Sequence, residues 1–123
     1  MRKIIAPNTP IIGHCYDYAI PNGAAPICAG PWLQPSLEFA GYDLAEGLNI
    51  VSAIIDSFYA MMNSLAGDAR NNFILVDTRN TLARVAFAQN GWANELHPYP
   101  EGFALLAQKF LTVLRNQFPA GSI

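Results

Sequence analysis

The sequence has 123 residues and a mass of 13.4 kDa, which is room for one small domain. Apolar residues make up 52% and charged residues only 13%, so intrinsic disorder, which needs polar and charged residues, is excluded. Seven Lys and Arg residues against nine Asp and Glu residues give a net charge of -2, and this disfavours nucleic-acid binding. A chain so short and so poor in charge is expected to leave apolar surface uncovered.

The sequence favours neither export nor a membrane span. Residues 1–7 carry two positive charges but no apolar run as long as that of a signal peptide. Residues 48–65 form the most apolar stretch, but five polar side chains interrupt it: Asn49, Ser52, Asp56, Ser57 and Asn63. Such side chains are costly in hydrocarbon. We therefore expect a cytoplasmic protein in which Cys15 and Cys28 stay reduced and semi-buried rather than forming a disulfide.

The first third of the chain is predicted to be strand and loop, because six of the nine prolines lie between Pro7 and Pro35. Residues 11–16, Ile-Ile-Gly-His-Cys-Tyr, are typical of a short buried strand. Asn22-Gly23 indicates a turn, and residues 24–35 are expected to form a loop.

A long helix is predicted after Asp43. Asp43 suits the N-cap position, and Glu46 stands where a reciprocal capping box needs it. Gly67 is expected to form a left-handed C-terminal cap. The apolar residues of one helix face recur at intervals of four and three: Leu44, Leu48, Val51, Ile55, Phe58, Met62 and Leu65.

Residues 72–77 predict a second buried strand, and a strand, a helical crossover and a strand make a unit whose strands run parallel. A last helix is expected from Pro100, with Glu101 in its first turn and Pro119 after its end. Its expected buried stripe is Phe103, Leu106, Phe110, Leu114 and Phe118. Two or three parallel strands make a poor complete sheet, so we expect a single α/β domain, residues 1–123, that needs a partner or a missing half to complete it.

Catalytic groups of parallel sheets gather at the carboxyl ends of the strands. Three segments are placed there: residues 14–18, residues 77–79 and the loop 92–98. His97 is the strongest candidate, because the N-terminus of the following helix would keep its imidazole neutral, as a general base requires. Asn94 can accept a hydrogen bond from the ring and fix its tautomer.

Several of these residues could have a structural role instead of a catalytic one. His97 could be an ordinary loop histidine that hydrogen-bonds a carbonyl. Asp77 and Arg79 are expected to form an ion pair that holds the loop, and Trp32 to be a packing anchor. Cys15, within the apolar strand, is expected to be an inert buried thiol rather than a nucleophile. A metal site is a weaker alternative, because its ligands would come from distant segments without ligand spacing: His14, Asp17 and His97.

The segment Asn94-Glu95-Leu96-His97-Pro98, followed by Glu101-Gly102-Phe103, resembles the last block of the SGNH (GDSL-type) serine hydrolases. In that block an Asp-x-x-His-Pro loop supplies the triad base and the residue that orients it. Three further segments are similar to a bacterial branch of the family: residues 14–18, 30–35 and 76–79. The resemblance extends from about Pro10 to Phe118.

The resemblance implies that His97 is the general base and Asn94 the orienting residue, and that the reaction uses no metal or organic cofactor. Asn stands where the family usually has Asp, so the charge that stabilises imidazolium is absent, unless Glu95 supplies it from the next position. The family's Gly-Asp-Ser nucleophile block and its oxyanion blocks are absent from this sequence. The serines present are expected in helical or terminal settings: Ser36, Ser52, Ser57, Ser64 and Ser122.

The expected fold is thus α/β, a partial flavodoxin-like three-layer sandwich of parallel strands with crossover helices, with its sheet incomplete in this chain. The expected function is the C-terminal part of an ester hydrolase that works through an acyl-serine and is inactive alone. Its partners would be a small ester substrate and either a complementing chain or a second copy, with no nucleic acid and no membrane. The alternative is a non-catalytic truncated relative that self-associates or binds a partner through its apolar sheet edge.

Overall fold

The computed structural model describes residues 9–24, 30–85 and 88–118. The predictions for residues 1–7, Cys28, Pro119 and Ser122 lie outside these residues. The described chain contains strands β1 (Ile11–His14) and β2 (Phe73–Val76), helices α2 (Gln34–Phe39), α3 (Leu44–Gly67) and α4 (Pro100–Gln117), and a 3-10 turn, η1 (Ala69–Asn71).

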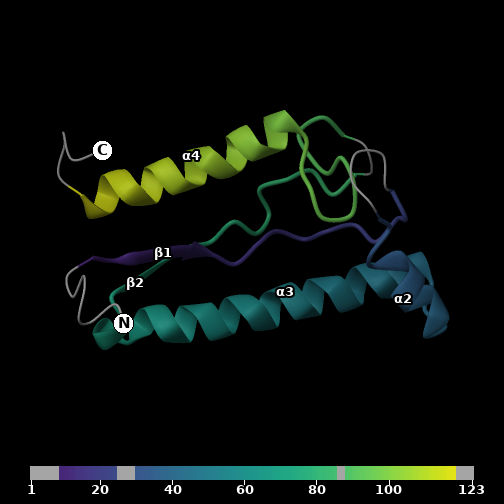
Figure 1. The fold of residues 1–123 in the computed structure, drawn as a ribbon, viewed down its shortest axis with the longest axis horizontal. Coiled ribbons are helices and arrows are strands. Elements are labelled where there is room, and N and C mark those ends of the chain that lie inside the picture. The colour runs from purple at the N-terminus through teal and green to yellow at the C-terminus, as the bar shows by residue number, and fades with distance from the viewer. Residues whose placement is uncertain (1–8, 25–29, 86–87, 119–123) are drawn as a thin grey trace.

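The two strands form a parallel sheet in which Ile11 is opposite Phe73 and His14 is opposite Val76. This pairing and its direction confirm the strand–crossover–strand prediction, with each strand shorter than expected and without a third strand in the described residues. Figure 1 shows three layers, with α4 on one side of the sheet and α3 on the other. Both helices contact β2. The structure is therefore a small mixed α/β fold.

Helix α3 begins as predicted. The Asp43 carboxylate accepts from the Glu46 backbone N–H at 2.8 Å, and the Glu46 carboxylate accepts from the Asp43 N–H at 2.9 Å. The expected cap at Gly67 is wrong, because Gly67 is the last helical residue and Asp68 follows in an extended conformation. The left-handed residue comes later: Asn72, with φ 47°, turns the chain from η1 into β2.

The apolar stripe of α3 is only partly covered. Its middle, around Val51, is buried, whereas Leu44, Phe58 and Leu65 are exposed. A strand of four residues is about 13 Å long. A helix of 24 residues is about 36 Å long, so this sheet cannot cover it from end to end. Among the described residues α3 is also the one helix long and apolar enough to cross a membrane.

Residues 34–39, expected partly as loop, form helix α2. Pro35 lies in the first turn of α2, where a missing backbone N–H costs nothing. Helix α4 begins at Pro100 with Glu101 in its first turn, as predicted. Its stripe is less buried than expected, because Phe103 is 52% exposed. The buried apolar core lies instead beside the sheet, and it comprises Ala19, Ile20, Val51, Leu82 and Trp92.

Candidate active site

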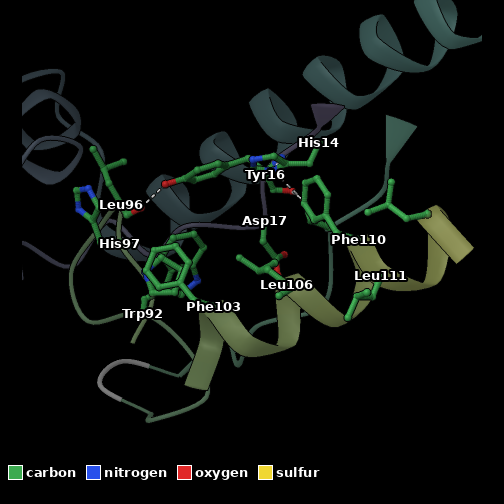
Figure 2. Close-up of a pocket in the computed structure, with 14 residues that line it drawn as sticks. His14, Tyr16, Asp17, Trp92, Leu96, His97, Phe103, Leu106, Phe110 and Leu111 are labelled. Carbon is green, nitrogen blue, oxygen red and sulfur yellow. Dashed lines mark hydrogen bonds between the residues drawn. The ribbon is translucent and has the colours of Figure 1, made fainter. Parts of the chain in front are cut away.

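A groove of about 570 Å³ lies between the carboxyl end of β1, the loop 92–98 and α4 (Figure 2). Its polar lining groups come from the strand end and from the loop: His14, Tyr16, Asp17, Thr78, Trp92 and His97. Its apolar wall comes from α4 and includes Phe103, Leu106 and Phe110. The structure therefore brings residues 14–18 and the loop 92–98 together, and the third predicted segment, residues 77–79, reaches the groove through Thr78, whereas Asp77 and Arg79 do not line it.

His97 stands exposed at one end of this groove and is held by Asn94. The side-chain oxygen of Asn94 accepts from the backbone N–H of Leu96 at 2.9 Å and of His97 at 2.8 Å. The same oxygen lies 3.1 Å from Nδ1 of the His97 ring. Because that oxygen can only accept, Nδ1 carries the proton when it makes this bond, and Nε2 is left with a free lone pair.

The loop that carries His97 is closed at its base. Trp92 and Pro98 pair across it, and the Ala93 N–H donates to the carbonyl of His97 at 2.9 Å. The Tyr16 hydroxyl donates to the carbonyl of Leu96, which ties the loop to the end of β1. These contacts fix the backbone on both sides of the imidazole.

Tyr16 reaches the loop from an unusual backbone conformation. Its φ is 73°, in the left-handed region that few non-glycine residues adopt. Burial raises the pKa of the Tyr16 phenol, so the hydroxyl remains a donor. The strand thus ends in a kink that aims a protonated phenol at the His97 loop.

Glu95 does not supply charge to His97. It is fully buried, and both of its oxygens accept backbone N–H groups from the segment that precedes and opens α2. Oε2 accepts from Trp32 at 2.5 Å and from Leu33 at 2.7 Å, and Oε1 from Gln34 at 2.8 Å and from Gly23 at 3.0 Å. Glu95 therefore fastens the loop to the chain around Gly23 and Trp32, whereas Asn94 orients the ring.

The hydrogen bond from the Trp32 N–H to Glu95 places Trp32 beside His97. The two rings meet edge to face with their centroids 5.8 Å apart. Trp32 is 36% exposed and packs against His97, outside the residues that line the groove.

Asp17 is a second buried carboxylate with four backbone donors. Its Oδ1 accepts from Tyr18 at 2.7 Å and from Asn80 at 2.8 Å, and its Oδ2 from Thr81 at 2.8 Å and from Leu82 at 2.7 Å. The Asp17 carboxylate therefore holds the loop after β2 against the end of β1.

In the described residues no group of three His, Cys, Asp or Glu side chains is placed to hold a metal ion.

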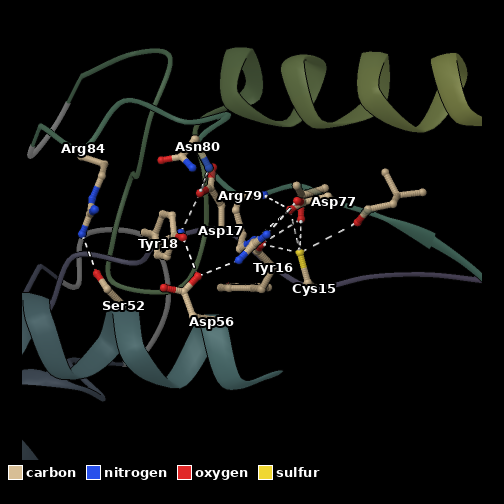
Figure 3. Close-up of polar contacts among 12 residues, drawn as sticks. Cys15, Tyr16, Asp17, Tyr18, Ser52, Asp56, Asp77, Arg79, Asn80 and Arg84 are labelled. Carbon is tan, nitrogen blue, oxygen red and sulfur yellow. Dashed lines mark hydrogen bonds and ion pairs between the residues drawn. The ribbon is translucent and has the colours of Figure 1, made fainter. Parts of the chain in front are cut away.

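Asp77 and Arg79 form the predicted ion pair, 2.9 Å apart; neither lines the groove, and Arg79 extends toward α3 (Figure 3). Arg79 also contacts Asp56 at 2.7 Å and lies 3.4 Å from the centroid of the Tyr59 ring. The hydrogen bonds from Arg79 lower the pKa of Asp77 to about 2. A hydrogen bond from Tyr18 is the largest cause that lowers the pKa of Asp56. This cluster fastens the loop after β2 to α3.

His14 and Cys15 have structural partners at the strand ends. Nδ1 of His14 accepts from the Tyr16 N–H at 3.2 Å and lies 3.4 Å from the Thr78 hydroxyl. Burial lowers the pKa of His14 and so favours its neutral form. Cys15 is fully buried, as expected, and its thiol lies 3.3 Å from the Asp77 carboxylate. Thr78 donates to the carbonyl of Tyr16 at 2.9 Å, so its hydroxyl is already used.

Two buried donors beside the groove have no acceptor among the described residues. They are the indole N–H of Trp92 and the side-chain amide N–H of Asn94. Buried polar groups nearly always have a partner. The amide of Asn94 cannot be turned over to find one, because its oxygen already serves two backbone donors.

The hydroxyls of the described serines all lie on helices: Ser36 on α2, and Ser52, Ser57 and Ser64 on α3. None of them lines the groove at His97. Sequence reasoning missed the clamps made by Glu95 and Asp17, whose partners, apart from the Tyr18 N–H, lie more than 60 residues away along the chain. Comparison with protein-family models, with curated proteins and with solved structures finds no match to this chain.

Proposed function

We propose that this chain is the C-terminal part of an SGNH-type ester hydrolase, with His97 as general base and Asn94 as the residue that orients it. The observation that carries the proposal is the 3.1 Å contact between the Asn94 oxygen and Nδ1 of His97, at the edge of a groove at the carboxyl ends of parallel strands. A serine and oxyanion donors from outside this sequence would complete the site. The proposed fold is a flavodoxin-like three-layer sandwich of which this chain is one part.

The proposed reaction uses Nε2 of His97 twice. Nε2 takes the proton of the serine hydroxyl as the serine oxygen attacks the ester carbonyl, and the resulting imidazolium protonates the departing alcohol. A water molecule then gives a proton to Nε2 as its oxygen attacks the acyl-serine, and Nε2 returns that proton to the serine oxygen as the acid departs, which regenerates the serine and the neutral imidazole. Asn94 keeps Nδ1 protonated through both halves, so Nε2 is the nitrogen that exchanges the proton.

The amide of Asn94 limits this dyad. Its oxygen sets the tautomer, but the amide adds no negative charge to stabilise the imidazolium that forms during the reaction. Glu95 does not compensate, because its carboxylate is bound on the side of Trp32. The proposed enzyme is therefore slow unless the completing part supplies charge near Nδ1.

The test joins this chain to the nucleophile-bearing half of an SGNH hydrolase and measures hydrolysis of p-nitrophenyl acetate. We expect turnover from the joined protein and none from this chain alone, which has no positioned nucleophile. His97→Ala should lower turnover of the joined protein about 10²–10⁴-fold, the usual contribution of a general base. Asn94→Asp, which adds the missing charge without changing the shape, should raise it.

Three outcomes contradict the proposal. One is turnover of the joined protein that His97→Ala leaves unchanged. Another is robust turnover by this chain alone that His97→Ala abolishes, since the chain would then contain its own nucleophile. A preparation of the joined protein that folds but has no activity also counts against the assignment.

A further inference from the structure

Trp32 is held in place by the backbone although its side chain is partly exposed. Its N–H and the N–H of Leu33 both donate to Oε2 of Glu95, whose carboxylate is fully buried. A buried carboxylate that accepts backbone N–H groups is costly to release, because those donors would lose their partner. Glu95 therefore fixes the piece of backbone from which the Trp32 indole projects.

Gly30 leaves the space that the indole occupies. A Cβ atom at Gly30 would lie 2.9 Å from Cε3 and from Cζ3 of the Trp32 ring, and 3.1 Å from Cη2. Carbon atoms that are not bonded approach one another to about 3.5–4.0 Å. Any side chain at Gly30 would therefore displace the indole, so the absence of one is what lets the ring lie where it does.

The same indole contacts the His97 ring. The two rings meet edge to face with their centroids 5.8 Å apart, a distance typical of favourable aromatic pairs. Within the described part of the chain the His97 ring has one hydrogen bond, between Nδ1 and the Asn94 oxygen. His97 is exposed, so water competes for that bond, and one such bond alone restrains a ring weakly. The indole provides the ring with a second contact.

We propose that Trp32 is a positioning residue for His97, which holds the imidazole in the orientation where Nδ1 meets Asn94. The inference rests on the proposed function, in which His97 is the general base. His97 lines the groove, whereas Trp32 and Asn94 do not. The two residues that hold the ring therefore restrain it without covering the groove. A base that is held before the substrate arrives need not be ordered during the reaction.

The test compares the unmodified chain with Trp32→Ala in long-range ¹H–¹⁵N spectra of the His97 ring, at a pH where the ring is neutral. An aromatic pair favours the held orientation by about 2- to 10-fold. Trp32→Ala should therefore lower the ratio of the Nδ1–H form to the Nε2–H form by that factor. It should also move the three-bond couplings of the His97 side chain toward rotationally averaged values.

Two further variants separate positioning from a general loss of packing. Trp32→Phe keeps an aromatic ring on the same backbone and should recover part of the Nδ1–H form. Phe39→Ala is the matched control, because Phe39 is 95% exposed at the end of α2 and its ring is not paired with His97. This control should leave the His97 spectra unchanged.

Two measurements decide the question if Trp32→Ala fails to fold. In the unmodified chain, nuclear Overhauser contacts should join protons of the Trp32 and His97 rings. In Gly30→Ala the indole and its Glu95 hydrogen bond remain, but the added methyl group must displace the ring, so the proton shifts of the His97 ring should change. The proposal is overturned by the absence of those Overhauser contacts, or by His97 spectra that Trp32→Ala or Gly30→Ala leaves unchanged.

These measurements use this chain alone and require no hydrolysis, so the two proposals can fail separately. His97 spectra that Trp32→Ala does not alter, together with an active joined protein, would contradict only the role of Trp32. The predicted change in the spectra, together with an inactive joined protein, would contradict only the hydrolase assignment. In an active joined protein, Trp32→Ala should lower kcat by about the same 2- to 10-fold and leave KM nearly unchanged, because Trp32 does not line the groove.

Discussion

Glu95→Gln is expected to destabilise the fold by about 3–5 kcal/mol, a large share of the 5–15 kcal/mol typical of small domains. Each carboxylate oxygen of Glu95 accepts two backbone N–H groups. Glutamine has nearly the same shape, but its NH₂ group would face two of those donors whichever way the amide turned. Two buried N–H groups would lose their acceptor, and the segment that carries Trp32 would come away from the His97 loop. Urea denaturation measures the change.

The control for this substitution is Glu101→Gln. This substitution makes the same chemical change at a nearby position. Glu101 is exposed in the first turn of α4 and stabilises the fold only through the helix dipole, by about 0.3–1 kcal/mol. Equal effects of the two substitutions would show that Glu95 is not a buried clamp.

Asp17→Asn is expected to cost a similar amount, about 3–5 kcal/mol, for the same reason. Its two oxygens hold the Tyr18 N–H and three successive N–H groups of the loop after β2, residues 80–82. The loss should free that loop and so raise the amide exchange of Thr81 and Leu82 well above that of β2. Urea denaturation and exchange of these two amides report the two effects separately.

Asp43→Asn provides the matched control. Asp43 is an exposed N-cap, and asparagine caps helices about as well as aspartate, so this variant should stay within about 0.5 kcal/mol of the parent. An Asp17→Asn variant that is as stable as Asp43→Asn would remove the structural role given to Asp17.

Much of the secondary structure can be predicted because its signals are local. The capping residues Asp43 and Glu46 lie three positions apart, and the apolar run before Asp77 is contiguous, so both elements were found. The prediction of a C-terminal cap at Gly67 was wrong because a glycine after an apolar stripe is typical of such a cap. The left-handed residue that turns the chain into β2 is Asn72, three residues after η1 begins. Helix α2 was missed because the prolines around it favour loop.

The same difference between local and long-range signals applies to the candidate site. Asn94 and His97 are three residues apart, so their contact is a property of one turn and follows from the sequence. Glu95 and Asp17 bond to segments far along the chain, and a carboxylate that accepts backbone N–H groups leaves no pattern in the residues it binds. The charges of Glu95 and Asp17 suggested a catalytic or metal-binding role, but in the structure both carboxylates hold loops in place by accepting backbone N–H groups.

The most direct test of the central claim is the tautomer of the His97 ring, read from long-range ¹H–¹⁵N spectra at a pH where the ring is neutral. The account predicts the Nδ1–H form, held by the Asn94 oxygen with the lone pair on Nε2, and a return toward the Nε2–H form of free histidine in Asn94→Ala. An Nε2–H ring in the unmodified chain, unchanged by Asn94→Ala, would contradict it.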